Sequence, residues 1–193
     1  NRFCVEDVTN LWSGFVAAAK EHSIKHLSLE LNPSLTGLCI SVSAAGVQKK
    51  GIISKVPAPK NMDLICLTGN VGAAYMGLHV LQREKVSFIK ESSQQPDLSK
   101  YKHILAAYLS PEINPSVVTR FLKEELYPST GHFLTRGLGA AILDLVKDTG
   151  FGAKIYLERI PVSTQSLEMA QEITMDMVTA IINGGEDYKF IFT

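Results

Sequence analysis

Two short segments of the sequence carry residue types that could bind phosphate and a metal ion. Residues 68–72, Thr-Gly-Asn-Val-Gly, follow an apolar stretch and precede a helical pattern. Glycines let backbone N–H groups face outward, and a helix N-terminus favours an anion, so this loop could hold a phosphate. The loop lacks the Gly-Lys-Ser/Thr of a Walker loop and the dinucleotide fingerprint, and an ordinary strand-to-helix turn is the alternative interpretation. The candidate phosphate-binding residues here are Thr68, Gly69, Asn70 and Gly72.

The second segment, residues 184–188, reads Gly-Gly-Glu-Asp-Tyr and places two adjacent carboxylates after a flexible turn. Because Mg²⁺ prefers one or two carboxylates together with phosphates, Glu186 and Asp187 are candidate metal ligands, with a plain hairpin or loop as the alternative. A further candidate is Arg136, which lies just before a helical pattern. Its guanidinium could bind a phosphate, although the cation would oppose the helix dipole, and a solvated arginine is the alternative. The five histidines are scattered, and the sequence shows no pattern typical of a Ser/His/Asp catalytic triad.

The composition limits the function classes. A chain of 193 residues with 46% apolar and 20% charged residues has the make-up of one large or two small globular domains. Lysine plus arginine and aspartate plus glutamate both number 19, so the overall basic charge of a nucleic-acid-binding protein is absent. No apolar run approaches the ~20 residues of a membrane span. The odd, widely spaced Cys4, Cys39 and Cys66 predict buried free thiols in a reducing cytoplasm.

The apolar spacing predicts the elements that must position these residues. Residues 5–20 follow helical spacing, and the period then changes to that of strands. We expect strands at residues 24–31, 38–43 and 52–56, the last two forming a hairpin. The stiff segment 57–61 predicts a linker, which divides the chain into domains at 1–60 and 61–193.

Beyond this linker, helices and strands mix without strict alternation. We expect strands at 62–67, 153–157 and 188–192. We expect helices at 73–83, 98–109, 115–126, 138–147 and 163–173. This pattern favours an α+β fold. The sequence begins with Asn rather than Met and ends inside an apolar run, so we expect that both ends have been cut.

Taken together, the segments 64–78 and 183–193 resemble the thiamine-monophosphate kinase family of the aminoimidazole-ribonucleotide-synthetase-like superfamily. Gly-Gly-Glu-Asp-Tyr before an apolar strand is the sharpest part of the resemblance, and segments 34–38 and 155–161 add to it. The resemblance runs nearly end to end and keeps its order.

The resemblance implies a fold and a reaction. The family has an N-terminal α/β domain, whose sheet pairs across a dimer, and a C-terminal α/β domain. Mg·ATP lies in the cleft, and its γ-phosphate passes to the phosphate of thiamine monophosphate, which gives the diphosphate. The resemblance therefore implies ATP and Mg²⁺ as cofactors, thiamine monophosphate as substrate, and a homodimer or hetero-complex through strands of the N-terminal domain.

The sequence departs from the family pattern at the metal motifs. The Gly-Asp-Asp motif would lie upstream of residue 1, and the Gly-Gly-Asp-Thr motif falls at residues 28–31, where Glu30 keeps a carboxylate. The Ser-Asp-Gly-Leu motif falls at 135–138, where Arg136 replaces a metal-binding carboxylate with a group that has no acceptor. Lys55 aligns with the family's nucleotide-contacting arginine.

Three hypotheses remain open on this basis. In the first, the chain is an ATP-dependent enzyme in which Glu186, Asp187 and Glu30 hold Mg²⁺ and another chain or segment supplies the missing acids. In the second, the chain is a degenerate paralogue that keeps the fold and acts as a binding or scaffolding protein. In the third, the chain is a truncated fragment of a family member with no separate role.

Overall fold

The computed structural model describes residues 3–35, 37–47, 51–91 and 96–193. The chain forms two compact units, Asn1–Lys50 and Gly51–Thr193. The domains predicted from the sequence, 1–60 and 61–193, stay a prediction.

The first unit contains the helix α1, Val5–Glu21, which confirms the helix predicted from apolar spacing. The backbone N–H of Cys4 donates to Oδ2 of Asp7 at 2.8 Å, so an acidic side chain closes the N-terminus. Lys20 lies in the last turn, and both charges therefore complement the helix dipole.

The strands predicted after α1 are wrong. The described residues between 24 and 47 contain no strand, and Ile53–Lys55 forms a short 3₁₀ helix, η1, instead. Alternation gives a segment one apolar face, but a strand also needs a hydrogen-bonded neighbour. The predicted hairpin turn at 48–50 lies outside the described residues. The alternating apolar side chains stay exposed: Leu27, Leu29, Leu31, Leu38, Ile40 and Val42.

The second unit contains a three-stranded antiparallel sheet of order β1-β3-β2. The three strands are β1 (Cys66–Leu67), β2 (Gly131–Phe133) and β3 (Phe190–Phe192). The predicted strands at 62–67 and 188–192 exist but are shorter, and β2 was not predicted. The strand predicted at 153–157 is wrong, and the 3₁₀ helix η3, Leu157–Arg159, begins there.

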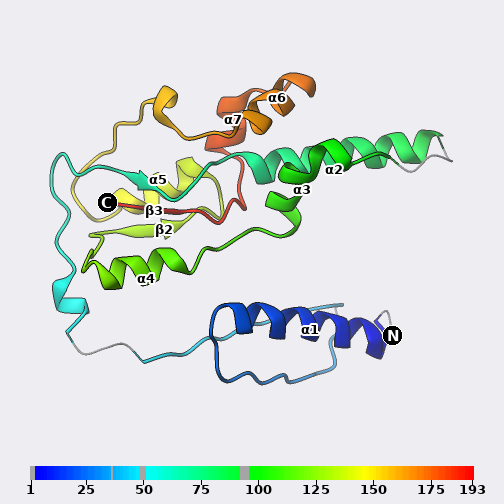
Figure 1. Cartoon of the computed structure of the whole chain (residues 1–193), viewed down its shortest axis with the longest axis horizontal. Coiled ribbons are helices and arrows are strands. Elements are labelled where there is room, and N and C mark those ends of the chain that lie inside the picture. The colour runs from blue at the N-terminus through cyan, green and yellow to red at the C-terminus, as the bar shows by residue number, and fades with distance from the viewer. Residues whose placement is uncertain (1–2, 36, 48–50, 92–95) are drawn as a thin grey trace. The chain divides into compact units, whose positions relative to one another are not determined.

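Helices lie on both sides of the sheet (Figure 1), and successive side chains of β3 point to opposite faces. Phe190 and Phe192 point to one face, where the ring of Phe121 from α4 (Ser116–Lys123) lies 6.2 and 5.0 Å from theirs. Ile191 points to the other face and is buried in a core cluster with residues of α5, Leu138–Val146. Helix α4 therefore packs on one face and α5 on the other, and this mixture of helices with a small antiparallel sheet agrees with the predicted α+β class.

A second core cluster joins the remaining helices of this unit. The helix α2 (Ala73–Glu91) packs on α3 and α6, with Met76 and Val80 fully buried. A Cβ at Gly77 would lie 2.5 Å from the carbonyl oxygen of Ile104, so glycine permits the close approach of α2 and α3. The other helical elements are η2 (Ser99–Tyr101), α3 (Lys102–Leu109), α6 (Thr164–Glu172) and α7 (Met177–Ile182).

The cysteines and the helices bear on two further predictions. Cys4, Cys39 and Cys66 are free but exposed, so the prediction that they are buried is wrong. Apolar neighbours in sequence indicated burial, but Cys4 and Cys39 lie outside any strand, and Cys66 lies on the edge strand β1 with its thiol exposed. In the part of the chain that the structure describes, none of the helices combines the length and apolarity needed to cross a bilayer.

Candidate functional site

The three motif segments meet at one end of the sheet. Because β1 and β2 both run antiparallel to β3, the segments that follow β1 and β2 lie beside the segment that precedes β3. The N–H of Thr68 donates to the carbonyl of Phe190 at 3.0 Å, and that of Glu186 donates to the carbonyl of Thr135 at 3.1 Å. The topology thus joins residues that are 122 and 51 positions apart in the sequence.

The carboxylate of Asp187 occupies the start of α2. Its Oδ2 accepts from the N–H of Gly72 at 2.8 Å, its Oδ1 accepts from the N–H of Ala74 at 3.1 Å, and the residue is 5% exposed. Of these two residues, Gly72 is one that the sequence predicted to bind a phosphate. Burial raises the pKa of Asp187, while the hydrogen bonds from Gly72 and Ala74 oppose that rise.

The glycine loop takes its shape from backbone conformations that side chains disfavour. Gly69 and Gly72 have φ of +114° and +87°, in the region that glycine adopts without strain. The aliphatic stem of Lys189 lies over Gly69, 3.4 Å from where a Cβ would stand. The hydroxyl of Thr68 accepts from the N–H of Phe190 at 2.9 Å, whereas Asn70 is exposed. The predicted loop therefore packs against residues 187–190.

The Gly-Gly pair allows the motif segments to pack closely. A Cβ at Gly185 would lie 2.5 Å from the carbonyl oxygen of Thr135. A Cβ at Gly184 would contact the carbonyl oxygen of Ala180 and lie 2.7 Å from Cβ of Tyr75. Glu186 follows with φ of +64°, and its exposed carboxylate has no partner among the described residues.

Arg136 pairs with a carboxylate on α5. Its Nη2 lies 2.7 Å from Oδ2 of Asp144, and its side chain is 69% exposed. The sequence did not predict this pair. The next residue, Gly137, packs against residues 182–184. The backbone of Arg136 therefore lies next to the Gly-Gly segment in space.

The remaining candidates, Lys55 and Glu30, lie elsewhere in the chain. The Nζ of Lys55 lies 3.4 Å from the hydroxyl of Tyr127 and 3.3 Å from Oε1 of Glu125, residues that precede β2. The hydrogen bond with Tyr127 and then the pair with Glu125 raise the pKa of Lys55. Glu30 is exposed and belongs to the first unit.

The acids of the second unit do not fit the magnesium site that the resemblance implies. Both oxygens of Asp187 accept backbone N–H groups, and Arg136 offers a metal no acceptor. Among the described residues, no group of three or more His, Cys, Asp or Glu side chains could hold a metal ion. The assignment of Glu186, Asp187 and Glu30 as metal ligands stays a prediction.

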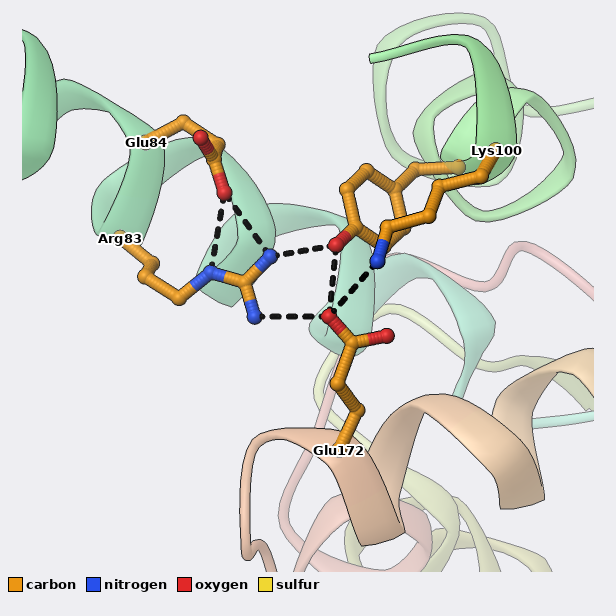
Figure 2. A network of polar contacts seen from close by, with 5 residues as sticks. Arg83, Glu84, Lys100 and Glu172 are labelled. Atoms are coloured by element: carbon orange, nitrogen blue, oxygen red, sulfur yellow. Dashed lines mark hydrogen bonds and ion pairs between the residues drawn. The ribbon is translucent and has the colours of Figure 1, made fainter. Parts of the chain in front are cut away.

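A polar network at another place in this unit was not predicted from the sequence. Figure 2 shows Arg83 and Lys100 directed at the carboxylate of Glu172, with Glu84 on the other side of the guanidinium. Oε1 of Glu172 lies 2.6 Å from the hydroxyl of Tyr101, 3.1 Å from Nζ of Lys100 and 3.2 Å from Nη1 of Arg83. The hydroxyl of Tyr101 also accepts from Nη2 of Arg83 at 2.6 Å. The network joins α2, η2 and α6.

The network makes stability depend on pH. The hydrogen bond from Tyr101, and then that from Lys100, lower the pKa of Glu172 to about 2 from 4.5. A folded pKa below the unfolded one stabilises the fold above pH 4.5, and this contribution is lost as the pH falls toward 2. Because the side chain is 41% exposed, we expect a loss of about 1 kcal/mol. Urea unfolding at pH 6 and pH 3 measures it, and Glu172→Gln should show a smaller pH dependence. Equal pH dependence in both proteins would contradict this expectation.

No protein-family model matches the chain, but comparison with curated proteins finds relatives. The thiamine-monophosphate kinase of Buchnera aphidicola subsp. Acyrthosiphon pisum is 26% identical over 189 residues, which cover 95% of this chain and 54% of that protein. The protein of the same name from Buchnera aphidicola subsp. Schizaphis graminum is 29% identical over 137 residues, 69% of this chain and 38% of that protein. The chain thus spans about half the length, or less, of these curated relatives.

Solved structures show the same fold. Thiamine monophosphate kinase from Aquifex aeolicus matches 66% of this chain and 40% of its own, with a TM-score of 0.56 and 20% identity. A structure of AaThiL complexed with AMPPCP and TMP has the same TM-score and identity, and covers 66% of this chain and 38% of that one. Thiamine-monophosphate kinase from Stenotrophomonas maltophilia K279a gives a TM-score of 0.54 at 19% identity, with coverage of 66% and 38%. The chain therefore resembles the thiamine-monophosphate kinases, in sequence along most of its length and in fold over about two thirds of it.

Proposed function

We propose that this chain takes part in the ATP-dependent phosphorylation of thiamine monophosphate to thiamine diphosphate. The observation that carries the proposal is the similarity to a thiamine-monophosphate kinase along 95% of the chain. The complex of AaThiL with AMPPCP, an ATP analogue, and TMP supports the choice of ligands.

In this proposal the positively charged side chains, and the amides of the glycine loop that do not donate to Asp187, bind phosphates. Phosphoryl transfer depends mainly on positioning and on neutralising charge, and Mg²⁺ would supply much of that neutralisation when bound. Lys189 over the glycine loop, together with Arg136, would face the negative charge. The acids of the second unit do not make a magnesium site by themselves, so the proposal requires Glu30 or carboxylates from another chain.

The proposal includes a homodimer or a hetero-complex formed through the first unit. The apolar side chains exposed along residues 27–42 are a surface that another chain could cover. Light scattering at high concentration tests this, and a clean monomer would contradict it. The free state of the three cysteines suits a reducing compartment such as the cytoplasm.

Isothermal titration calorimetry of this chain with Mg·ATP, with and without thiamine monophosphate, tests the proposed binding. A ligand at 100 times its Kd should also stabilise the fold by about 2.7 kcal/mol in a thermal melt. Glu186→Ala should abolish binding, because Glu186 carries the exposed carboxylate of the motif. The matched control is Glu168→Ala, which removes an exposed glutamate of α6. No binding at millimolar ATP would overturn the proposal for this chain alone.

A second candidate function is that of a degenerate paralogue that binds or scaffolds a partner without turnover. The observation that favours it is that two motif side chains already have partners within the chain. Asp187 accepts from the amides of Gly72 and Ala74, and Arg136 donates to Asp144. A protein of this kind binds no Mg·ATP. Binding in the micromolar range that Glu186→Ala abolishes would therefore exclude it.

Replacing Arg136 separates the two candidates. If the chain is an enzyme, Arg136→Asp should raise turnover of ATP and thiamine monophosphate, because it restores the carboxylate of the family motif and reverses the charge by two units. A phosphate-release assay measures turnover, and circular dichroism checks folding. Unchanged turnover in a folded variant would contradict the view that Arg136 occupies the former metal position.

A further inference from the structure

A cavity of about 450 Å³ opens at the end of the sheet opposite the motif segments. Its walls include residues that precede β1, such as Asp63 and Leu64, residue Thr130 before β2, and Thr193 after β3. The glycine loop follows β1, and residues 184–188 precede β3. The cavity is therefore separate from the candidate site, and none of the candidate phosphate or metal residues lines it.

The floor of this cavity is part of the core. Leu138 and Leu145 of α5 and Ile191 of β3 are buried in one cluster and line the cavity. Half-buried Ile142 and Ile160 extend the same apolar surface. The volume is within the usual range for small-molecule sites, about 300–1,000 Å³, and such sites are mostly apolar with a few polar groups.

The rim of the cavity is positively charged. Lys60, Lys154 and Arg159 line it, and none of the three forms an ion pair with a carboxylate in the described ranges. Asp63 is the acid among the lining residues, and its Oδ2 accepts from the backbone N–H of Lys60 at 2.7 Å. Lys154 and Arg159 share a contact with Tyr156, at 5.0 and 5.2 Å from the ring centroid. Two cations are thus held at one edge of an apolar cavity.

We propose that this cavity binds a small organic anion that has an aromatic or aliphatic body and a phosphate, sulfonate or carboxylate group. The apolar body would replace water over the floor, and the anionic group would pair with Lys154 and Arg159 at the rim. An uncharged apolar molecule would leave the cations unpaired, and a bare inorganic anion would leave the floor in contact with water. The combination of floor and rim therefore selects molecules that carry both parts.

Titration of the whole chain with 1-naphthyl phosphate, followed by amide chemical shifts of the ¹⁵N-labelled protein, tests the site. We expect shifts at residues 60–63 and 152–156 and none at 68–74. Lys154→Ala and Arg159→Ala should each weaken binding about tenfold, the usual effect of losing one charged contact. Both side chains are exposed, so these variants should fold. The matched control, Lys85→Ala on the exposed face of α2, should bind like the unmodified chain.

Further ligands and one more variant sharpen the test. 1-Naphthol and inorganic phosphate, each carrying one half of the probe, should bind at least about tenfold more weakly than the whole. Ala153→Trp, which fills the cavity from an exposed position, should remove the shifts while leaving the fold intact.

Three results would overturn the proposal. Binding of 1-naphthol as tight as that of the phosphate would remove the role of the cations. Shifts confined to the exposed apolar residues of the first unit, or to residues 68–74, would place the probe elsewhere. At high concentration and with no probe bound, a second copy of the chain could protect the amides of residues 60–63 from hydrogen exchange. That result would assign the cavity to a protein contact. Each result is independent of Mg·ATP binding, because the two sites share no residue.

Discussion

The Asp187→Ala variant should lose about 3 kcal/mol of its free energy of unfolding. The substitution leaves the N–H groups of Gly72 and Ala74 buried without an acceptor, and each unpaired group of this kind costs about 1–3 kcal/mol. Urea unfolding followed by circular dichroism measures the loss. The free energy of unfolding of Asp187→Asn should lie between those of the unmodified chain and of Asp187→Ala, because the amide oxygen of Asn keeps one acceptor.

The neighbouring acid supplies the matched control for this measurement. Glu186 is exposed and has no partner in the described part of the chain, so Glu186→Ala should change the stability by less than about 0.5 kcal/mol. Equal, small losses in both variants would show that Asp187 does not hold the start of α2. In that case Asp187 would remain available as a ligand, as the sequence predicted.

The Gly137→Ala variant should lose about 3 kcal/mol or more. Gly137 has φ of +94°, where a side chain costs about 1–2 kcal/mol. A Cβ there would also contact the carbonyl oxygen of Gly184 and lie 2.6 Å from that of Ile182, which adds about 1–3 kcal/mol for overpacking against backbone. Thermal and urea unfolding should both report the loss.

Gly150 separates the two causes. Its φ is +76°, but a Cβ at this position would meet nothing within 4 Å. Gly150→Ala should therefore lose only the conformational part, about 1 kcal/mol. If both glycine variants lost the same amount, the close packing of residues 135–138 on residues 182–184 would contribute nothing to stability.

Local signals in the sequence predicted α1 to α6, although α2 continues to Glu91 instead of ending at residue 83, and α7 was not predicted. The helix expected at 163–173 is α6, and the hydroxyl of Ser163 caps it by accepting from the N–H of Ser166 at 3.1 Å. The helix expected at 138–147 agrees with α5, which ends at Val146. These features depend on neighbours within a few positions, which the sequence displays directly.

The strands and the contacts of the site depend on distant partners, and one sequence does not display them. Leu38 and Ile40 alternate like strand residues but have no strand beside them. Gly72 and Asp187 were both identified, yet for separate roles, because their contact joins residues 115 positions apart. The resemblance to a family ordered the motifs but gave no distances. For the network around Tyr101 and Glu172 the sequence carries no spacing signal.

The order of strands in the sheet has a consequence for synthesis on the ribosome. β3 lies between β1 and β2, although it comes after both along the chain. While the chain emerges, β1 and β2 have no strand to pair with, and the N–H groups of Gly72 and Ala74 lack the carboxylate that later binds them. Residues 187–192 supply both, so the two earlier strands and the start of α2 lack these hydrogen-bond partners until that stretch leaves the exit tunnel. Translation that stops before residue 187 therefore yields helices without a sheet.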